Sequence, residues 1–138
     1  MTGTAHRCID EMLTAARARL DRLTPNEARA SARSGGVIVD IRAERYQLTE
    51  GVISGAVIIE RNVLEWRLDP TSHSRLPIAR YELPVIVVCN DGYASSFAAV
   101  TLKELGIHRA TDVIGGFRAW RTAGLPTTYV RSPTTGEG

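Results

Sequence analysis

One cysteine in a short loop is the residue of this sequence best suited to nucleophilic chemistry. Cys89 ends the apolar run 85–89, which has the composition of a buried strand, and a helical pattern begins at Ser95. The carboxyl ends of strands are where open α/β sheets bind their ligands. The first N–H groups of the following helix favour an anion, and the thiolate is the nucleophilic form of cysteine. This arrangement indicates a cysteine nucleophile in an anion-binding loop.

The expected substrate-binding loop consists of Asn90, Asp91, Gly92, Tyr93, Ala94 and Ser95. Gly92 allows the backbone to curl without a Cβ clash, so that several N–H groups can point inward as an anion-binding nest. However, cysteine is among the most buried residue types, so Cys89 could serve only the core. The Asn-Asp-Gly sequence is also typical of a hairpin turn, but the helical pattern after it argues against a returning strand. The residues alone leave the catalytic and the packing interpretations of Cys89 open.

The elements that must position this loop follow an alternating pattern of strands and helices. Runs rich in β-branched residues predict strands at 36–41, 57–59, 85–89 and 111–114. Continuous apolar runs of this kind are typical of strands buried on both faces of a parallel sheet. Helical periodicity over 95–105 supplies a connection between the last two strands. The sequence therefore predicts an α/β fold with a mainly parallel central sheet and helices on both faces.

Two further helices are expected before the first strand. Residues 7–22 place apolar and charged side chains at helical spacing, which predicts an amphipathic N-terminal helix. Thr24 and Pro25 provide an N-cap and a first helical residue for a second helix, which should end near Gly35. At the other end of the chain, residues 127–138 are small and polar, so we expect a flexible tail there.

Three segments in a fixed order carry a resemblance to a known family. The first combines Asp40-x-Arg42 with the later stretch 51–56, and the second is the Cys89 loop. The third is 116–126, with the pattern Gly-Phe-x-x-Trp-x-x-x-Gly-Leu-Pro. Together, in this order and spacing, they resemble the rhodanese-homology family of sulfurtransferases over most of the chain.

The resemblance implies a fold, a domain plan and a mechanism. A rhodanese-like three-layer sandwich would occupy residues 23–126, with residues 1–22 as a helical extension and residues 127–138 as a tail. Cys89 would take a sulfane sulfur from a thiosulfate-like or persulfide donor and hold it as a persulfide stabilised by the loop N–H groups. It would then pass the sulfur to a thiol, to cyanide or to a partner sulfur-carrier protein. No metal or organic cofactor is implied.

The resemblance also gives roles to residues outside the loop. Asp40 and Arg42 are expected to be buried polar partners that shape the region beside it. Many family members have an arginine or another polar residue where Ala94 stands, so a charge that would contact a donor's sulfonate is missing here. Arg61 follows the second predicted strand at the same sheet edge, and either it or Arg67 is a candidate to supply that charge.

Other functions are weighed beside the sulfurtransferase. Related phosphatase loops place an arginine six positions after the cysteine, where Ser95 stands here, so phosphatase chemistry is not expected. The absence of a charge at Ala94 keeps two alternatives open: a catalytically weak binding or regulatory module, and a sulfur relay that works only with a partner protein. Retention of Cys89 together with Gly92 favours the enzyme.

Composition limits the partners and the location. The 138-residue chain has a formal net charge of +2 with its basic residues spread along its length, so nucleic acid is not an expected partner. No apolar run approaches the ~18 residues of a membrane helix, and the N-terminus lacks the apolar core of a secretory signal. We therefore expect a cytoplasmic protein in which Cys8 and Cys89 are free thiols. The three scattered histidines predict no metal site.

Overall fold

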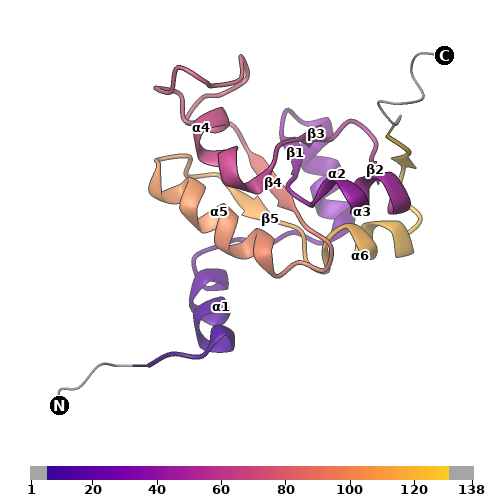
Figure 1. The fold of residues 1–138 in the computed structure, drawn as a ribbon, viewed down its shortest axis with the longest axis horizontal. Coiled ribbons are helices and arrows are strands. Elements are labelled where there is room, and N and C mark those ends of the chain that lie inside the picture. The colour runs from indigo at the N-terminus through magenta and orange to yellow at the C-terminus, as the bar shows by residue number, and fades with distance from the viewer. Residues whose placement is uncertain (1–5, 131–138) are drawn as a thin grey trace.

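A parallel sheet of four short strands forms the centre of the computed structural model, which describes residues 6–130. The strand order is β3-β1-β4-β5, with bounds Val57–Ile58, Val37–Asp40, Val85–Val88 and Thr111–Asp112 (Figure 1). All three neighbouring pairs are parallel, and the central pair aligns Val39 with Val87. The four predicted strands are confirmed, although each is shorter than its apolar run.

Helices cover both faces of this sheet. Their bounds are α1 Ile9–Arg17, α2 Pro25–Arg33, α3 Glu44–Glu50, α4 Leu64–Leu68, α5 Ala94–Glu104 and α6 Gly116–Thr122, with the 3-10 turn η1 at Arg61–Val63. Successive strand side chains point to opposite faces, so Val87 packs into the core with α4 and α5, and Val88 into the core with α2 and α6. The predicted three-layer α/β architecture is therefore confirmed. No helix within residues 6–130 is long and apolar enough to cross a membrane.

The start of α2 agrees with the sequence pattern. The Thr24 hydroxyl oxygen accepts a hydrogen bond from Glu27 N–H at 3.2 Å, and the Glu27 carboxylate accepts one from Thr24 N–H at 2.9 Å. This reciprocal arrangement is a capping box, and Pro25 occupies the first helical position. The cap fixes the point at which α2 begins, directly after the segment that carries Arg22.

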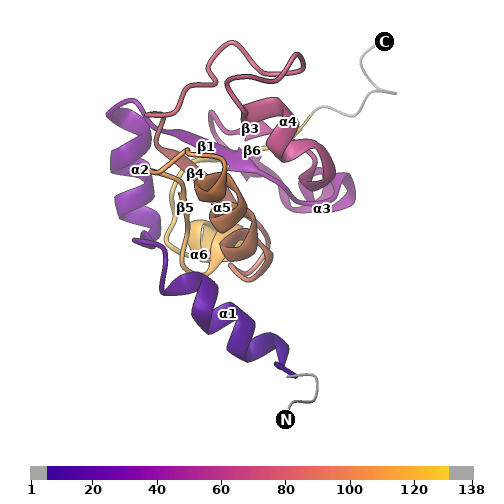
Figure 2. The same ribbon diagram turned by 90° about the vertical axis from the view of Figure 1, so that its left-hand side faces the viewer.

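The N-terminal helix is shorter than predicted. It ends at Arg17 rather than at residue 22, and residues 18–23 form turns and a short link to α2. Leu20 in this link is buried in the core that contains α5, whereas Ile9 at the start of α1 is exposed. In both views α1 lies beside one end of α5 and projects away from the body of the molecule (Figures 1 and 2).

The expectation of a flexible tail is wrong at its first residues. Thr127–Thr128 form β6, which pairs antiparallel with β2, Val52–Ile53. A ladder of backbone hydrogen bonds needs no apolar side chains, so two threonines can extend it. The indole N–H of Trp120 also donates to the carbonyl of Pro126 at 2.9 Å, which anchors the chain just before β6. The rest of the predicted tail, residues 131–138, lies outside the described residues.

Candidate active site

Cys89 lies directly beyond the carboxyl end of β4, where the chain turns into the loop before α5. Its Sγ accepts hydrogen bonds from Gly92 N–H at 3.2 Å and from Ser95 N–H at 3.3 Å, and the residue is only 8% exposed. Hydrogen bonds to the charged form of a group favour that form, and the thiolate is the nucleophile. These two donors favour the nucleophilic interpretation of Cys89 over simple packing.

The loop carbonyls are engaged by the start of α6. Phe117 N–H donates to the Cys89 carbonyl at 2.8 Å, and Arg118 N–H donates to the Asn90 carbonyl at 3.1 Å. Gly116 permits this close approach, because a Cβ at that position would come within 2.5 Å of the Cys89 carbonyl oxygen. The carbonyl oxygens of Cys89 and Asn90 therefore point toward α6, while N–H groups of the loop donate to the Cys89 sulfur.

Four more N–H groups of the loop donate no hydrogen bond within residues 6–130, namely those of Asn90, Asp91, Tyr93 and Ala94. Gly92 has a left-handed φ of +86°, and the next residue, Tyr93, is right-handed with a φ of −100°. Neighbouring residues of opposite handedness make successive N–H groups converge on one concavity, which binds anions. The loop thus has the backbone geometry of a nest around the Cys89 sulfur.

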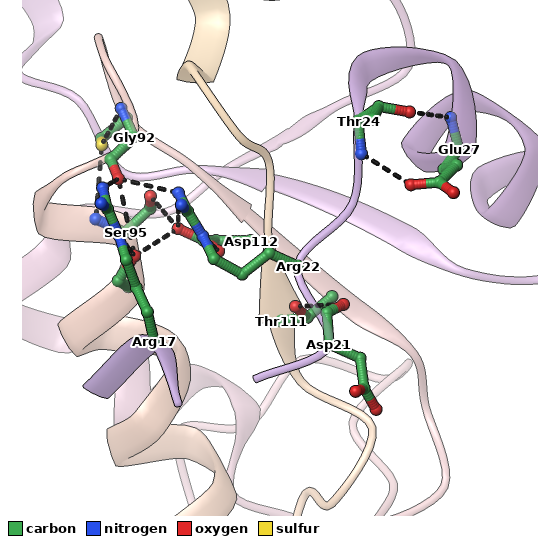
Figure 3. A network of polar contacts seen from close by, with 11 residues as sticks. Arg17, Asp21, Arg22, Thr24, Glu27, Gly92, Ser95, Thr111 and Asp112 are labelled. Carbon is green, nitrogen blue, oxygen red and sulfur yellow. Dashed lines mark hydrogen bonds and ion pairs between the residues drawn. The ribbon is translucent and has the colours of Figure 1, made fainter. Parts of the chain in front are cut away.

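A fully buried carboxylate, Asp112 at the end of β5, organises the start of α5. It accepts hydrogen bonds from the hydroxyl groups of Ser95 and Ser96, both at 2.7 Å, and its Oδ1 lies 2.8 Å from Arg22 Nε (Figure 3). A buried charge is tolerated only when it is paired and hydrogen-bonded, and Asp112 has both kinds of partner. The sequence analysis missed Asp112. The available signal was an acidic residue within the fourth predicted strand, at the sheet edge that Cys89 occupies.

Asp40 and Arg42 form a buried ion pair at the carboxyl end of β1. Arg42 Nη2 lies 2.8 Å from the Asp40 carboxylate and also donates to the Gly51 carbonyl at 2.6 Å. The Arg42 guanidinium stacks over the ring of Phe117, with its carbon 4.0 Å from the ring centroid. Because Phe117 N–H holds the Cys89 carbonyl, the ion pair connects β1 with the element that shapes the loop.

Arg61 lies in a pocket of about 640 Å³ that it shares with Arg42, between the carboxyl ends of β1 and β3. Its guanidinium lies 2.9 Å from the Glu65 carboxylate one helical turn away. Arg67 donates to a backbone carbonyl seven residues further on. Within residues 6–130, neither arginine is hydrogen-bonded to the Cys89 loop. A contact between Arg61 and a bound donor stays a prediction.

Arg118 of α6 ties the loop to α3. Its guanidinium lies 2.9 Å from the Asp91 carboxylate and 2.8 Å from the Glu50 carboxylate, and Arg121 lies 3.6 Å from Glu50. The hydrogen bond from Arg118, helped by the charges of nearby arginines, lowers the pKa of Glu50 from its usual 4.5. The same hydrogen bond raises the pKa of Arg118. The ion pair between Arg118 and Glu50 is therefore pH-dependent, and it connects the Asp91 side of the loop with α3.

Acid should weaken the fold through Glu50. A carboxyl group whose pKa is lowered on folding stabilises the native state above its unfolded pKa, and this contribution is lost as the pH falls through the folded pKa. The Glu50→Gln variant should lose up to about 1 kcal/mol of unfolding free energy at neutral pH, and this loss should shrink toward zero as the pH falls through the lowered pKa of Glu50. Urea unfolding across this range measures the difference. Glu44→Gln, an exposed change on the same helix, is the control; equal pH profiles for the two variants would contradict the prediction.

This chain is similar in sequence to a known domain family and to a named sulfurtransferase. A family model described as a rhodanese-like domain matches residues 24–123. The thiosulfate sulfurtransferase GlpE of Stutzerimonas stutzeri is 32% identical over 100 residues, which cover 72% of this chain and 84% of that protein. The family match begins after α1 and after the link that carries Arg22.

Solved structures give the same fold. A Rhodopseudomonas palustris protein of unknown function, described as a possible tyrosine phosphatase, superimposes with a TM-score of 0.80 at 36% identity, covering 92% of this chain and 98% of that one. A rhodanese-related protein from Thermoplasma volcanium superimposes with a TM-score of 0.64 at 20% identity, covering 79% of this chain and 98% of its own. The second likeness supports the fold alone.

Proposed function

Because the chain belongs to the rhodanese-like domain family, we propose that it is a sulfurtransferase that carries a sulfane sulfur on Cys89. The observation that carries the proposal is the convergence of Gly92 N–H and Ser95 N–H on the Cys89 sulfur. A persulfide is anionic, so the same donors and the unused N–H groups of the loop can stabilise it. Both cysteines of the chain are free thiols, which suits work in the reducing cytoplasm.

The proposed reaction has two half-reactions. In the first, the Cys89 thiolate attacks the outer sulfur of thiosulfate, a new S–S bond forms, the old S–S bond breaks, and sulfite leaves with the electron pair. In the second, cyanide or a thiolate attacks the outer sulfur of the persulfide, and the Cys89 thiolate is released unchanged. Thiocyanate or a new persulfide is the product. Ping-pong kinetics follow from this covalent intermediate.

The donor is either a small thiosulfate-like anion or a persulfide on another protein. Ala94 offers no charge to a sulfonate group, which favours a donor that needs none. Arg61 and Arg42 line the neighbouring pocket, and Arg61 would have to leave Glu65 to bind an anionic donor there. A partner sulfur-carrier protein is therefore proposed beside thiosulfate as a source or acceptor of sulfur.

Phosphatase chemistry, named for the Rhodopseudomonas palustris protein, is disfavoured in this chain by Ser95. A cysteine phosphatase needs an arginine fork for the phosphoryl oxygens six residues after the cysteine. Here the Ser95 hydroxyl instead donates to the buried carboxylate of Asp112 at 2.7 Å. The side chain at that position thus faces a carboxylate and brings no positive charge to the loop.

Intact-mass measurement after incubation with excess thiosulfate tests the proposal. The protein should gain ~32 Da, the mass of one sulfur atom on a covalent carrier, and cyanide should remove it. The Cys8→Ser variant should gain the same mass, because Cys8 is exposed at the start of α1 and far along the chain from the loop.

The donor class is decided by a second incubation, with a protein persulfide in place of thiosulfate. A gain with both donors supports a thiosulfate enzyme, and a gain with the protein donor alone supports a sulfur relay. No gain with either donor would contradict the carrier function and favour the binding-module alternative.

A further inference from the structure

Two arginines that precede the family match converge on one carbonyl oxygen of the loop. Arg17 Nη2 donates to the Gly92 carbonyl at 2.7 Å, and Arg22 Nη2 donates to the same oxygen at 3.0 Å (Figure 3). Arg17 closes α1, and Arg22 lies in the link to α2. The N-terminal segment therefore reaches the loop itself, through two charge-assisted hydrogen bonds.

This carbonyl shares its peptide unit with the N–H of Tyr93. In a trans peptide the C=O and the following N–H point in opposite directions, and no peptide bond of the described residues is cis. Holding the Gly92 oxygen toward the arginines therefore holds Tyr93 N–H away from them. The opposite handedness of Gly92 and Tyr93 directs that N–H into the concavity where Gly92 N–H already contacts the Cys89 sulfur.

The charges of the two arginines are not balanced in the same way. Arg22 is paired with the buried Asp112 carboxylate. Arg17 has no carboxylate partner within residues 6–130. Besides its bond to the Gly92 carbonyl, it donates to the Ser96 hydroxyl at 3.3 Å, and its guanidinium carbon lies over the Tyr93 ring, 5.4 Å from the ring centroid. The positive charge of Arg17 is therefore not balanced by a carboxylate. It lies at the carbonyl end of the Gly92–Tyr93 peptide, opposite to the N–H end, and polarises that peptide.

We propose that Arg17 and Arg22 are positioning residues for the persulfide, acting through the Gly92 carbonyl to present Tyr93 N–H to its outer sulfur. The inference rests on the proposed function. Gly92 N–H and Ser95 N–H bind the inner sulfur, which is present in both the thiolate and the persulfide. The Tyr93 donor serves the atom that only the persulfide has. Loss of Arg17 should therefore lower the equilibrium constant for sulfur loading more than it lowers the reactivity of the Cys89 thiolate.

The experiment compares Arg17→Met, which keeps most of the side-chain length but has no donor, with Arg17→Lys and with the control Arg19→Met. Arg19 lies in the same segment but pairs with Glu104 on the surface. Two quantities are measured: the equilibrium constant for loading from thiosulfate with release of sulfite, and the rate at which iodoacetamide alkylates the unloaded Cys89 thiolate.

In Arg17→Met the loading constant should fall about tenfold, as expected for loss of a charge-assisted hydrogen bond, while the alkylation rate changes less than about twofold. The loading constant of Arg17→Lys should lie between those of Arg17→Met and the wild type, and the loading constant of Arg19→Met should equal that of the wild type. The amide proton of Tyr93 should shift on loading in the wild type, and it should shift less in Arg17→Met. If Arg17 had a merely structural role, Arg17→Met would lower the thermal midpoint and would change the loading constant and the alkylation rate to the same extent.

Two results would overturn the inference. One is an Arg17→Met loading constant equal to that of Arg19→Met, and the other is a parallel fall of loading and alkylation, which would place the effect on the inner sulfur. Failure of the proposed function looks different, because then the wild type itself loads no sulfur from thiosulfate or from a protein persulfide.

Discussion

Replacing Cys89 by serine should reduce kcat/KM for transfer of sulfur from thiosulfate to cyanide by about 10³-fold or more. A serine hydroxyl stays protonated at neutral pH, so it can neither attack the donor nor hold the outer sulfur as an anion. Its oxygen can still accept the N–H groups of Gly92 and Ser95, which donate to Sγ in the native loop. The variant should therefore unfold at nearly the wild-type temperature.

The rate of thiocyanate release and the thermal midpoint, measured on the same preparations, check this prediction. Cys8→Ser is the matched control, since it removes the other thiol at an exposed position and should leave both quantities unchanged. Turnover by Cys89→Ser at the wild-type rate would exclude the covalent mechanism. Loss of turnover in Cys8→Ser would mean that the N-terminal thiol takes part in the transfer.

Much of the fold could be predicted because its signals are local. The β-branched run before Cys89 gives β4 directly, and Thr24 with Pro25 gives the first turn of α2. The pairing of β6 with β2 carries no comparable signal, since it joins two threonines to a distant strand at a point where the Trp120 indole N–H and Ser54 N–H both donate to the Pro126 carbonyl. Contacts of this kind depend on the assembled structure.

The candidate site divides in the same way. The position of Cys89 and the nest around it follow from a strand, a glycine and a helix that are consecutive in the sequence. Asp112 could have been joined to Cys89 only through its place in the fourth predicted strand, at the same sheet edge. Arg17 lies far from the loop along the chain, and no spacing rule connects it with Cys89. Arg61 pairs with Glu65, one turn away on the same helical segment, and the contact predicted between Arg61 and a donor's sulfonate stays a prediction.

Gly92→Ala is the substitution expected to damage fold and site together. The φ of +86° is costly for any residue with a Cβ, and that Cβ would come within 2.8 Å of Gly115 N and 3.1 Å of the Val113 carbonyl oxygen. Both neighbours are backbone atoms, so no side-chain rotation can relieve the contact. We expect a loss of about 3 kcal/mol of unfolding free energy, from the left-handed backbone and the overpacking together.

Gly55→Ala separates these two causes. Gly55 has nearly the same φ, +84°, but a Cβ there would meet no atom within 4 Å. This variant should lose about 1 kcal/mol, the cost of the backbone conformation alone, and should keep its sulfur-transfer rate. Urea unfolding gives the two free energies, and single-turnover loading gives the two rates. If Gly92→Ala loses no more stability than Gly55→Ala, the start of α6 can move away from the loop. In that case the Gly92→Ala loading rate would show whether the nest works without that support, because Phe117 N–H and Arg118 N–H would no longer hold the loop carbonyls.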